Sequence, residues 1–241
     1  MPVAIITGAS RGLGEAISRG LAERGWSLVI DARGAAALQR VRGELEGMAR
    51  EHGGRVVAVP GDVTDEGHRQ ALADAAEALG GAELVVNNAS VLGPSPQPAL
   101  ASYPLDVLAT VYQVNVVAPL GVVQATYDQL RRHGGAVLNV TSDAGVEAYE
   151  GWGGYGSSKA ALEQLSAVLA AEMPDVAVWW VDPGDLRTQM HADAFPGEDI
   201  SDRPLPETVV PGLLHLIERR LPSGRYRAAQ LLEATTTGAR P

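Results

Sequence analysis

The sequence has no cysteine, few aromatic residues and no long apolar run, and each absence narrows what the chain can be. Without cysteine, disulfides, thiolate metal sites and thiol catalysis are excluded. Aromatic residues make up 5% of the chain, with a single Phe, so we expect a core of Ala, Val, Leu and Ile. No apolar run approaches about 18 residues, and no charged leader precedes the first apolar stretch. We therefore expect a cytoplasmic protein that does not contact a membrane.

Basic residues are also scarce. Nineteen Lys and Arg stand against 29 Asp and Glu, which gives a net charge of −10. This balance disfavours the attraction to polyanions that dominates nucleic-acid affinity, so we expect no nucleic-acid partner. The 241 residues, 46% of them apolar, contain no linker and fit one α/β domain over residues 1–233. A flexible tail of small and polar residues is predicted at 234–241.

A strand, a glycine turn and a helix follow one another at the amino terminus. Residues 3–6 form a short apolar run, typical of a parallel strand buried on both faces. The turn permits close approach of the backbone to a phosphate, and the helix predicted at residues 15–24 presents free N–H groups to an anion. A second strand at residues 28–30 favours dinucleotide binding over a simple turn. The glycines of the turn are Gly8, Gly12 and Gly14.

Tyr155 and Lys159 lie four residues apart, ahead of a helical pattern at residues 160–173, so their side chains should share one helical face. A free tyrosine titrates near 10, whereas a proton donor at neutral pH works best with a pKa near 7. An adjacent ammonium favours the phenolate and lowers that pKa. The hydroxyl of Ser142 should emerge where a buried strand at residues 136–140 ends. Taken alone, the Tyr–Lys pair also fits an exposed helical turn.

The order and spacing of these motifs point to a known family. The chain resembles the short-chain dehydrogenases/reductases over residues 3–231. The resemblance implies a single doubly wound α/β (Rossmann) domain, whose mostly parallel seven-stranded sheet has helices on both faces. The motifs are Thr7-Gly8-Ala9-Ser10-Arg11-Gly12-Leu13-Gly14, then Asn87-Asn88-Ala89, then Asn115, Ser142, Tyr155 and Lys159 at intervals of 27, 13 and 4 residues.

The resemblance also implies an activity, the interconversion of a carbonyl and an alcohol in a small-molecule substrate by hydride transfer. Tyr155 would exchange the proton, and Lys159 would lower the pKa of Tyr155 and hold the nicotinamide ribose. Ser142 would orient the carbonyl, and Asn115 would complete a proton relay. Thr141 is a rival hydroxyl, but only Ser142 keeps the 13-residue interval to the tyrosine. A catalytically idle sensor or scaffold of the same fold is the alternative.

The end of the second strand bears on the choice of cofactor. An acidic residue there would accept from a ribose 2′-hydroxyl, whereas arginine would favour a 2′-phosphate. In the family register the acidic position falls on Ala32 and the basic position on Arg33, with Arg11 as the second basic position. We predict NADP(H) as the cofactor, with Asp31 turned toward the sheet or the solvent.

Other cofactor contacts are implied by the family register. Asp62 would accept from the adenine amino group; the alternative is a helix cap, for which Thr64 or Asp65 is better placed. Ser90 stands where the family usually has glycine, and it is not carried over. The full implied set is Thr7, Gly8, Ser10, Arg11, Gly12, Leu13, Gly14, Arg33, Asp62, Val63, Asn88, Ala89, Tyr155, Lys159, Pro183, Gly184 and Thr188.

The remaining segments complete the expected domain. Residues 105–132 predict two helices with Asn115 near their junction, and their apolar face, a subunit contact in the family, predicts a homodimer or homotetramer. Residues 184–206 predict a lid over the substrate, in which His191 would be a solvated loop residue. Trp179 and Trp180 are interpreted as packing residues. Residues 225–231 predict a last edge strand.

Overall fold

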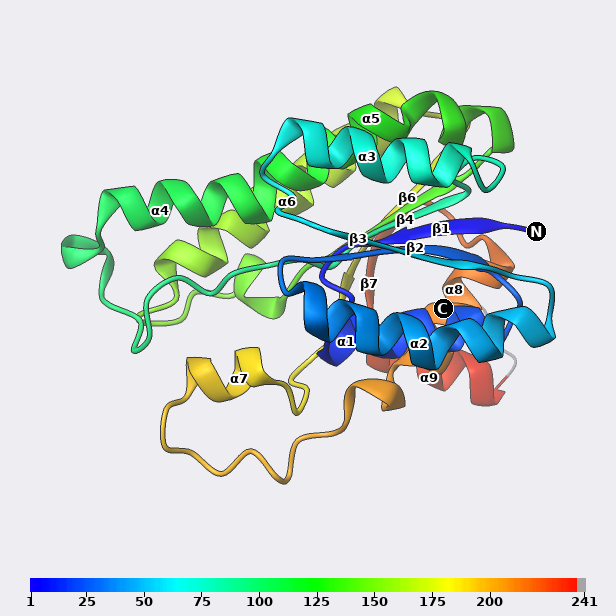
Figure 1. Cartoon of the computed structure of the whole chain (residues 1–241). Coiled ribbons are helices and arrows are strands. Elements are labelled where there is room, and N and C mark those ends of the chain that lie inside the picture. Colours follow the sequence, from blue (N-terminus) through cyan, green and yellow to red (C-terminus); the bar gives the residue numbers. More distant parts are fainter. Residues whose placement is uncertain (238–241) are drawn as a thin grey trace.

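The computed structural model describes the backbone of residues 1–237 and the side chains of residues 1–233. One seven-stranded sheet runs through the molecule, in the order β3-β2-β1-β4-β5-β6-β7, and every neighbouring pair is parallel (Figure 1). The predicted doubly wound fold is therefore confirmed. The strands are β1 (Val3–Ile6), β2 (Ser27–Ala32), β3 (Val56–Pro60), β4 (Leu84–Asn87), β5 (Ala136–Val140), β6 (Ala177–Asp182) and β7 (Gly224–Arg227).

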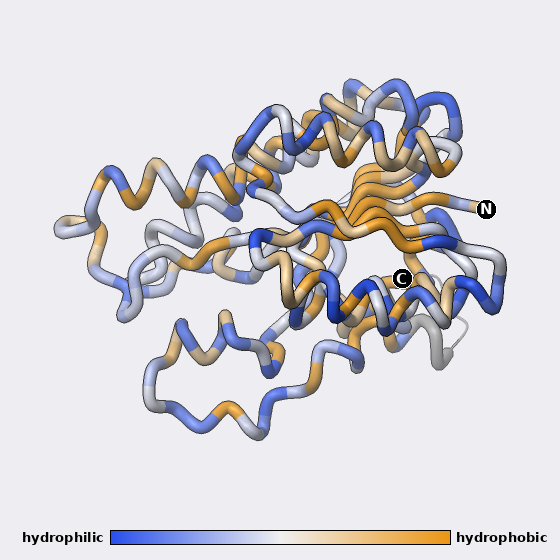
Figure 2. The backbone as a smooth tube through the Cα atoms, in the orientation of Figure 1, coloured by the Kyte–Doolittle hydropathy of each residue, from blue (hydrophilic) through white to orange (hydrophobic). Residues whose placement is uncertain are grey.

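Helices cover both faces of the sheet, because successive strand residues point to opposite sides. Ile6 and Ile30 belong to one buried cluster and Ile5 and Val29 to the other. The apolar strands stack at the centre of the molecule (Figure 2). Helices α1 (Gly12–Ala22), α2 (Ala35–Glu51), α8 (Val210–Arg219) and α9 (Ala228–Thr237) cover the first face, and α3 (Glu66–Glu77), α5 (Ala118–His133) and α6 (Gly153–Glu172) cover the second.

The carboxyl-terminal segment differs from its predicted structure. The edge strand predicted at residues 225–231 ends at Arg227, and α9 begins at the next residue. The sequence there is rich in strong helix formers, and Ala228 and Leu231, three residues apart, are both buried on one helical face. The backbone of residues 234–237, which were assigned to a tail, continues α9. The rest of that predicted tail, residues 238–241, lies outside the described residues.

The segment Leu105–His133 is one continuous helical stretch of 29 residues. Helix α4 (Leu105–Tyr112) leads through a π turn (η2, Gln113–Val117) into α5, so the predicted junction at Asn115 is a widened turn within the helix. Pro119, four residues later, has no N–H to donate to the Asn115 carbonyl. By length and by the composition of its most apolar 18 residues, the stretch could span a membrane, yet it packs against α3 and α6 of this fold.

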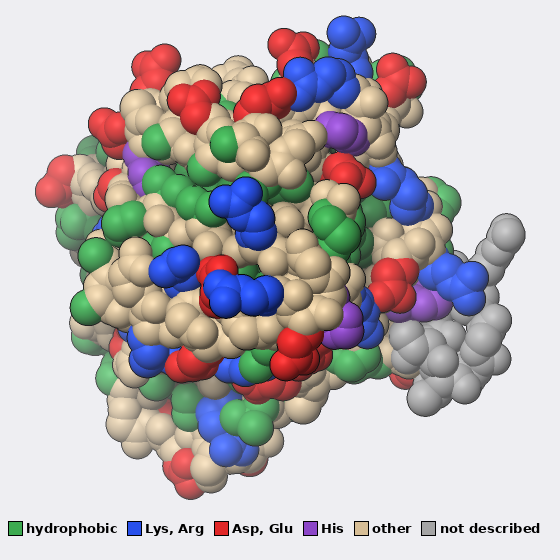
Figure 3. All heavy atoms as spheres, turned by 45° about the vertical axis from the view of Figure 1, so that its right-hand side comes forward, with side chains coloured by type: hydrophobic (Ala, Val, Ile, Leu, Met, Phe, Trp, Pro, Cys, Tyr) green, Lys and Arg blue, Asp and Glu red, His purple; other side chains and the backbone are tan. Residues whose placement is uncertain are grey.

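Charged side chains are mixed on the face of the molecule in Figure 3, where acids and bases lie side by side. On α2, Arg40 pairs with Glu44 and Arg42 with Glu46, each pair one helical turn apart. Exposed pairs of this kind contribute little to stability, because solvent and salt screen them. They keep these arginines beside acids rather than in a basic patch.

Candidate active site

A deep cleft opens at the carboxyl ends of the strands and has a volume of about 850 Å³. The strand order reverses between β1 and β4, and ligands of open α/β sheets bind at such a switch point. The walls come from the turn after β1, the ends of β2, β4 and β5, the start of α6 and the segment after β6. Most residues proposed from the sequence line this one cleft; Thr7 lies beneath its floor.

The glycine turn leaves its backbone open to the cleft. Gly8 and Gly12 have φ angles of 67° and 60°, which other residues rarely adopt. A Cβ on Gly14 would lie 2.5 Å from the side-chain nitrogen of Asn88 and from the carbonyl oxygen of Gly8. Helix α1 starts at Gly12 without a side-chain cap, so its first N–H groups are available to an anion. These features fit the pyrophosphate of a dinucleotide.

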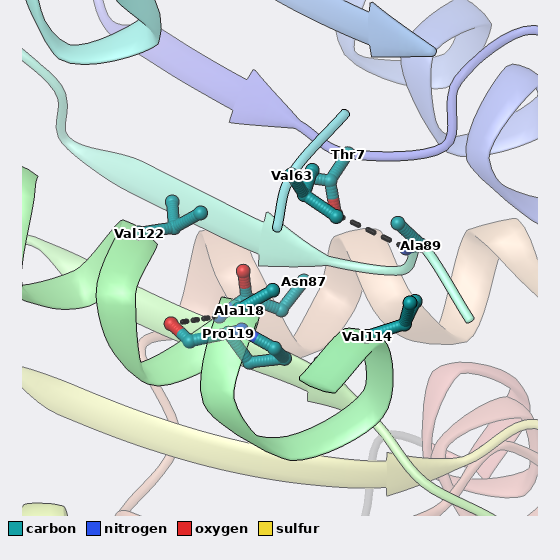
Figure 4. Close-up of a pocket in the computed structure, with 8 residues that line it drawn as sticks. All are labelled: Thr7, Val63, Asn87, Ala89, Val114, Ala118, Pro119 and Val122. Carbon is teal, nitrogen blue, oxygen red and sulfur yellow. Dashed lines mark hydrogen bonds between the residues drawn. The ribbon is translucent and has the colours of Figure 1, made fainter. Parts of the chain in front are cut away.

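Thr7 and Asn88 hold that turn in place. The Thr7 hydroxyl donates to the Val86 carbonyl at 3.3 Å and accepts from the backbone N–H groups of Asn88 and Ala89, each at 3.0 Å. The Asn88 amide donates to the carbonyls of Thr7 and Gly8 at 2.9 and 3.1 Å. Figure 4 shows Thr7 and Ala89 facing each other across a small, tightly packed crevice beneath the cleft. The side chains of Thr7 and Asn88 thus bond within the protein, and they hold the glycine turn in its shape.

The end of β2 combines a buried carboxylate with an exposed arginine. Arg33 is exposed and lines the cleft, as does Arg11 across from it. The Asp31 side chain is 1% exposed and turns toward α3, where its Oδ1 lies 3.0 Å from Nε2 of His68. Desolvation raises the pKa of Asp31, and the hydrogen bond from His68 opposes this shift. Nothing in the sequence pattern identified His68 as the partner of Asp31.

Asp62 and Val63 lie in the cleft wall beside this strand end. Asp62 Oδ1 accepts from the backbone N–H of Thr64 at 2.9 Å and from its hydroxyl at 2.7 Å, and these bonds lower the pKa of Asp62. The cap of α3 is Asp65, which accepts from the backbone N–H of His68 at 2.7 Å. Asp62 is therefore not the cap of α3, and it lines the cleft.

Tyr155 and Lys159 share the buried face of α6, which begins at Gly153, earlier than the predicted helix. The Lys159 Nζ lies 5.4 Å from the centroid of the Tyr155 ring and donates to the Val140 carbonyl at 2.8 Å. Burial lowers the pKa of Lys159 to about 8, although the nearby Glu163 carboxylate acts in the opposite direction. Both side chains line the cleft.

The pKa of Tyr155 differs from the expectation of an acidic phenol. Burial raises it above the ordinary value for tyrosine, while hydrogen bonds with Ser142 and Ser90 partly offset the rise. The carboxylates of Asp143 and Asp182 raise it further. The protein alone therefore keeps the phenol protonated, which suits a proton donor in a reduction.

Ser142 is the hydroxyl that faces Tyr155. Its Oγ donates to Asp143 Oδ1 at 2.9 Å and accepts from the Ala144 N–H at 3.2 Å. The rival Thr141 is 2% exposed and donates to Glu163 Oε1 at 2.8 Å, away from the tyrosine. Asp143, which the sequence pattern did not single out, fixes the direction of the Ser142 proton.

The Asn115 side chain is fully engaged within the protein. Its Oδ1 accepts from the Ser90 hydroxyl at 3.1 Å and from the Val91 N–H at 2.9 Å. Its Nδ2 donates to the Val91 carbonyl at 2.9 Å and to the Ser158 hydroxyl at 3.0 Å. Two donors and two acceptor sites are all that an amide has, so the side chain of Asn115 has no capacity left for another partner. Ser90, the departure from the family pattern, joins Asn115 to the surroundings of Tyr155.

The segment after β6 closes the other side of the cleft. Pro183 and Gly184 line it, and Thr188 caps the short helix α7 (Gln189–Ala194) by accepting from the His191 N–H at 3.2 Å. The prediction that His191 is solvated is wrong, because its side chain is 9% exposed and its ring lies 4.9 Å from that of Phe195. Phe195 also packs against Trp152, so the three rings form one aromatic cluster.

Trp179 is a packing residue, as predicted. It is fully buried, and its Nε1 donates to the Leu221 carbonyl at 2.8 Å. A separate apolar cluster forms the wall around the tyrosine. It contains Leu92, Ala144 and Tyr155, and Trp152, Met190 and Ala194 pack on it.

A glycine turn at the switch point of a parallel sheet, with a tyrosine and a lysine beside the same cleft, defines a nucleotide-dependent oxidoreductase of the doubly wound class. The sequence model of the family described as short chain dehydrogenase matches residues 2–199. The chain belongs to this family. As such it is an oxidoreductase that acts on carbonyl or alcohol groups with a nicotinamide cofactor.

Individual relatives and solved structures agree with this assignment. The rhamnolipids biosynthesis 3-oxoacyl-(acyl-carrier-protein) reductase of Pseudomonas aeruginosa is 38% identical over 197 residues, which cover 78% of this chain and 74% of that protein. The sepiapterin reductase of Meriones unguiculatus is 34% identical over 200 residues, 78% and 75% of the two chains. An alcohol dehydrogenase of the archaeon Thermococcus sibiricus, complexed with 5-hydroxy-NADP, superposes with a TM-score of 0.83 at 30% identity, over 94% and 95% of the chains.

Proposed function

We propose that this protein interconverts a carbonyl and an alcohol with NADP(H), with Tyr155 as the general acid and base. The observation that carries the proposal is the gathering of Tyr155, Lys159 and Ser142 on the cleft that also contains the glycine turn. A bound nicotinamide cofactor supplies or accepts the hydride. An idle nucleotide sensor would need no proton donor, and the complete polar set therefore favours an enzyme.

The residues of the site would each have a separate role in binding the substrate and moving the proton. The Ser142 hydroxyl, which donates to Asp143 in this structure, would turn its proton to the substrate oxygen and orient it together with Tyr155. Tyr155 gives its proton to that oxygen in reduction and takes one from the alcohol in oxidation. Lys159 has one N–H on the Val140 carbonyl, which leaves two for the ribose and the proton path. The backbone carbonyl of Asn115, to which Pro119 has no N–H to donate, would hold the water that connects Lys159 to solvent.

Lys159 is the only lysine among the 19 basic residues of the chain. Arginine remains charged at any working pH, whereas a buried lysine can release its proton near neutrality. The one place where the sequence uses lysine is the place where an amine that can change its charge is needed. This choice supports a proton-transfer role for Lys159.

A panel of carbonyl compounds with NADPH tests the proposed function. Aliphatic, aromatic and cyclic ketones and aldehydes are offered, and the absorbance of reduced nicotinamide is followed with the parent protein and the Tyr155→Phe variant. We expect consumption with at least one class of carbonyl in the parent only. Cofactor binding without turnover on any carbonyl or alcohol would support the sensor instead.

Arg33→Ala is expected to abolish the preference for NADPH. Arg33 lines the cleft at the end of β2 and has no hydrogen bond within the described residues, so its guanidinium is available for a 2′-phosphate. Loss of a charge-assisted bond should reduce kcat/KM with NADPH by about 10- to 100-fold and leave that with NADH within about 2-fold. Arg50→Ala, a change on the exposed end of α2, is the control. An unchanged ratio would count against Arg33.

We also propose a homodimer or homotetramer formed through the helices around Asn115. Val117 on the helix, Tyr127 on α5 and Val168 on α6 are 46%, 37% and 40% exposed, which leaves apolar surface uncovered. Sedimentation at micromolar concentration should give a dimer or larger for the parent, and smaller species for Val117→Glu. Val146→Glu, which changes an exposed valine outside these helices, should behave like the parent. A monomeric parent would contradict the proposal.

A further inference from the structure

The buried contact between Asp31 and His68 has no part in the roles proposed above. Asp31 lies at the carboxyl end of β2, two residues before Arg33, and only 1% of its side chain is exposed. A carboxylate in such a position is costly unless a donor compensates for lost water. The side-chain donor is the ring of His68 on α3, 3.0 Å away and itself 9% exposed, and the backbone N–H of Gly8 is a second, weaker partner.

The His68 ring is held firmly in its position. Its backbone N–H donates to Asp65, which fixes the start of α3. Its ring lies directly against Gly61, where a Cβ would come within 2.2 Å of the ring Nδ1. Any other residue at position 61 would displace the ring, so the glycine, the histidine and the aspartate form one packed unit, of which Gly61 and Asp31 line the cleft.

This unit adjoins the part of the cleft that would hold the ribose and adenine. Asp31, Arg33 and Asp62 all line it. A freed carboxylate at the strand end could do two things, both unfavourable to a 2′-phosphate: it could pair with the Arg33 guanidinium, or it could repel the phosphate directly. At separations of several ångströms inside a protein, either effect is worth about 10-fold or more in affinity.

We propose that His68 determines cofactor specificity by holding the Asp31 carboxylate away from the ribose, so that Arg33 stays available to a 2′-phosphate. This inference rests on the proposed preference for NADP(H). It explains how a chain with an acidic residue at the end of β2 can accept the phosphorylated cofactor. His68 acts through Asp31 and is a positioning residue.

Binding of two nucleotide fragments tests the proposal without turnover. The probes are 2′,5′-ADP and 5′-AMP, which differ only in the 2′-phosphate, and calorimetry gives their dissociation constants. His68→Phe keeps a ring against Gly61 but removes both nitrogens. We expect it to weaken 2′,5′-ADP by about 10-fold and to change 5′-AMP by less than about 2-fold. His68→Gln retains one donor and should stay near the parent value.

Removing the carboxylate should reverse the defect. The double variant His68→Phe with Asp31→Asn is expected to bind 2′,5′-ADP within about 3-fold of the parent, because no charge is left to restrain. Equal weakening of both nucleotides by His68→Phe, or no recovery in the double variant, would overturn the proposal. His68→Met, which fills the site without a donor, takes the place of His68→Phe if that variant does not fold.

The two proposals fail in different ways. A parent protein that binds 2′,5′-ADP no better than 5′-AMP would overturn the preference for NADP(H), and the role of His68 with it. A parent that prefers 2′,5′-ADP by a factor that His68→Phe leaves unchanged would overturn the role of His68 alone.

Discussion

Tyr155→Phe is expected to lower kcat by about 10³-fold, within the range that a general acid contributes. The change removes one oxygen and keeps the ring, which is 7% exposed and packs edge-on against Trp152 at a centroid distance of 5.8 Å. The fold and the cleft should therefore remain. Steady-state rates with the best carbonyl from the panel, beside the dissociation constant of NADPH, measure the effect. Cofactor affinity should change by less than about 2-fold.

Tyr226→Phe is the matched control for this change. Tyr226 lies on β7 outside the cleft, and its hydroxyl donates to the Pro222 carbonyl at 2.8 Å, so loss of this hydroxyl should leave kcat within about 2-fold of the parent. If Tyr155→Phe kept most of the parent's kcat, another group would have to move the proton, and the assignment of Tyr155 would be wrong. A loss of NADPH binding in step with kcat would indicate a structural role instead.

Local sequence patterns predicted most of the fold. The strands β1 and β5 begin and end at the predicted residues, because short apolar runs bounded by glycine or polar residues are strong signals for buried parallel strands. The segment after β7 misled the prediction because its apolar residues suit either a strand or a helix over so few positions. Ala228 and Leu231 pack against the first face of the sheet, and this burial favours the helix over the strand.

The candidate site likewise contains residues that a local sequence pattern predicts and residues that it does not. Tyr155, Lys159 and Ser142 could be found because their spacing along one helix and one strand end is fixed by backbone geometry. His68 and Asp143 could not, because their roles depend on contacts that no local period encodes. His68 meets Asp31 across 37 residues of chain, and Asp143 matters only through the proton direction of Ser142. The sequence pattern gave Asn115 a relay role, which stays a prediction, but it did not show that the amide of its side chain is saturated by Ser90, Val91 and Ser158.

The pKa values of the pair give a consistent picture of the reaction. Burial raises the pKa of Tyr155 and lowers that of Lys159 to about 8, so a protonated phenol lies beside an amine that can lose its proton. A lysine with such a pKa can pass a proton to the phenol during turnover and regain one from solvent. We therefore propose a proton path that runs through both groups, in place of a phenol acidified by the lysine charge alone.

Lys159→Met is expected to abolish turnover and to stabilise the protein at neutral pH. The lysine is 2% exposed, and burial of its ammonium lowers its pKa from 10.5 to about 8. That shift corresponds to a destabilisation on the order of 3 kcal/mol. Methionine fills the space without a charge but leaves the Val140 carbonyl without its donor, which costs about 1 kcal/mol. The net gain in unfolding free energy should be about 1–2 kcal/mol at pH 7.

The pH dependence of this gain distinguishes the cause. Between about pH 8 and pH 10.5 the unfolded chain binds the lysine proton and the folded chain does not, so the parent gains stability as pH rises through that window. The variant has no such group, so its advantage should be largest below pH 8, disappear within this window and give way by pH 10.5 to a parent that is more stable by about 1 kcal/mol, the value of the lost Val140 hydrogen bond. Urea denaturation at a series of pH values measures it. Since Lys159 is the only lysine, amine labelling of the folded protein as a function of pH, with the modified peptide that contains Lys159 quantified separately from the amino-terminal one, reports its pKa. An advantage that did not shrink with rising pH would mean that packing, and not the buried charge, separates the two proteins.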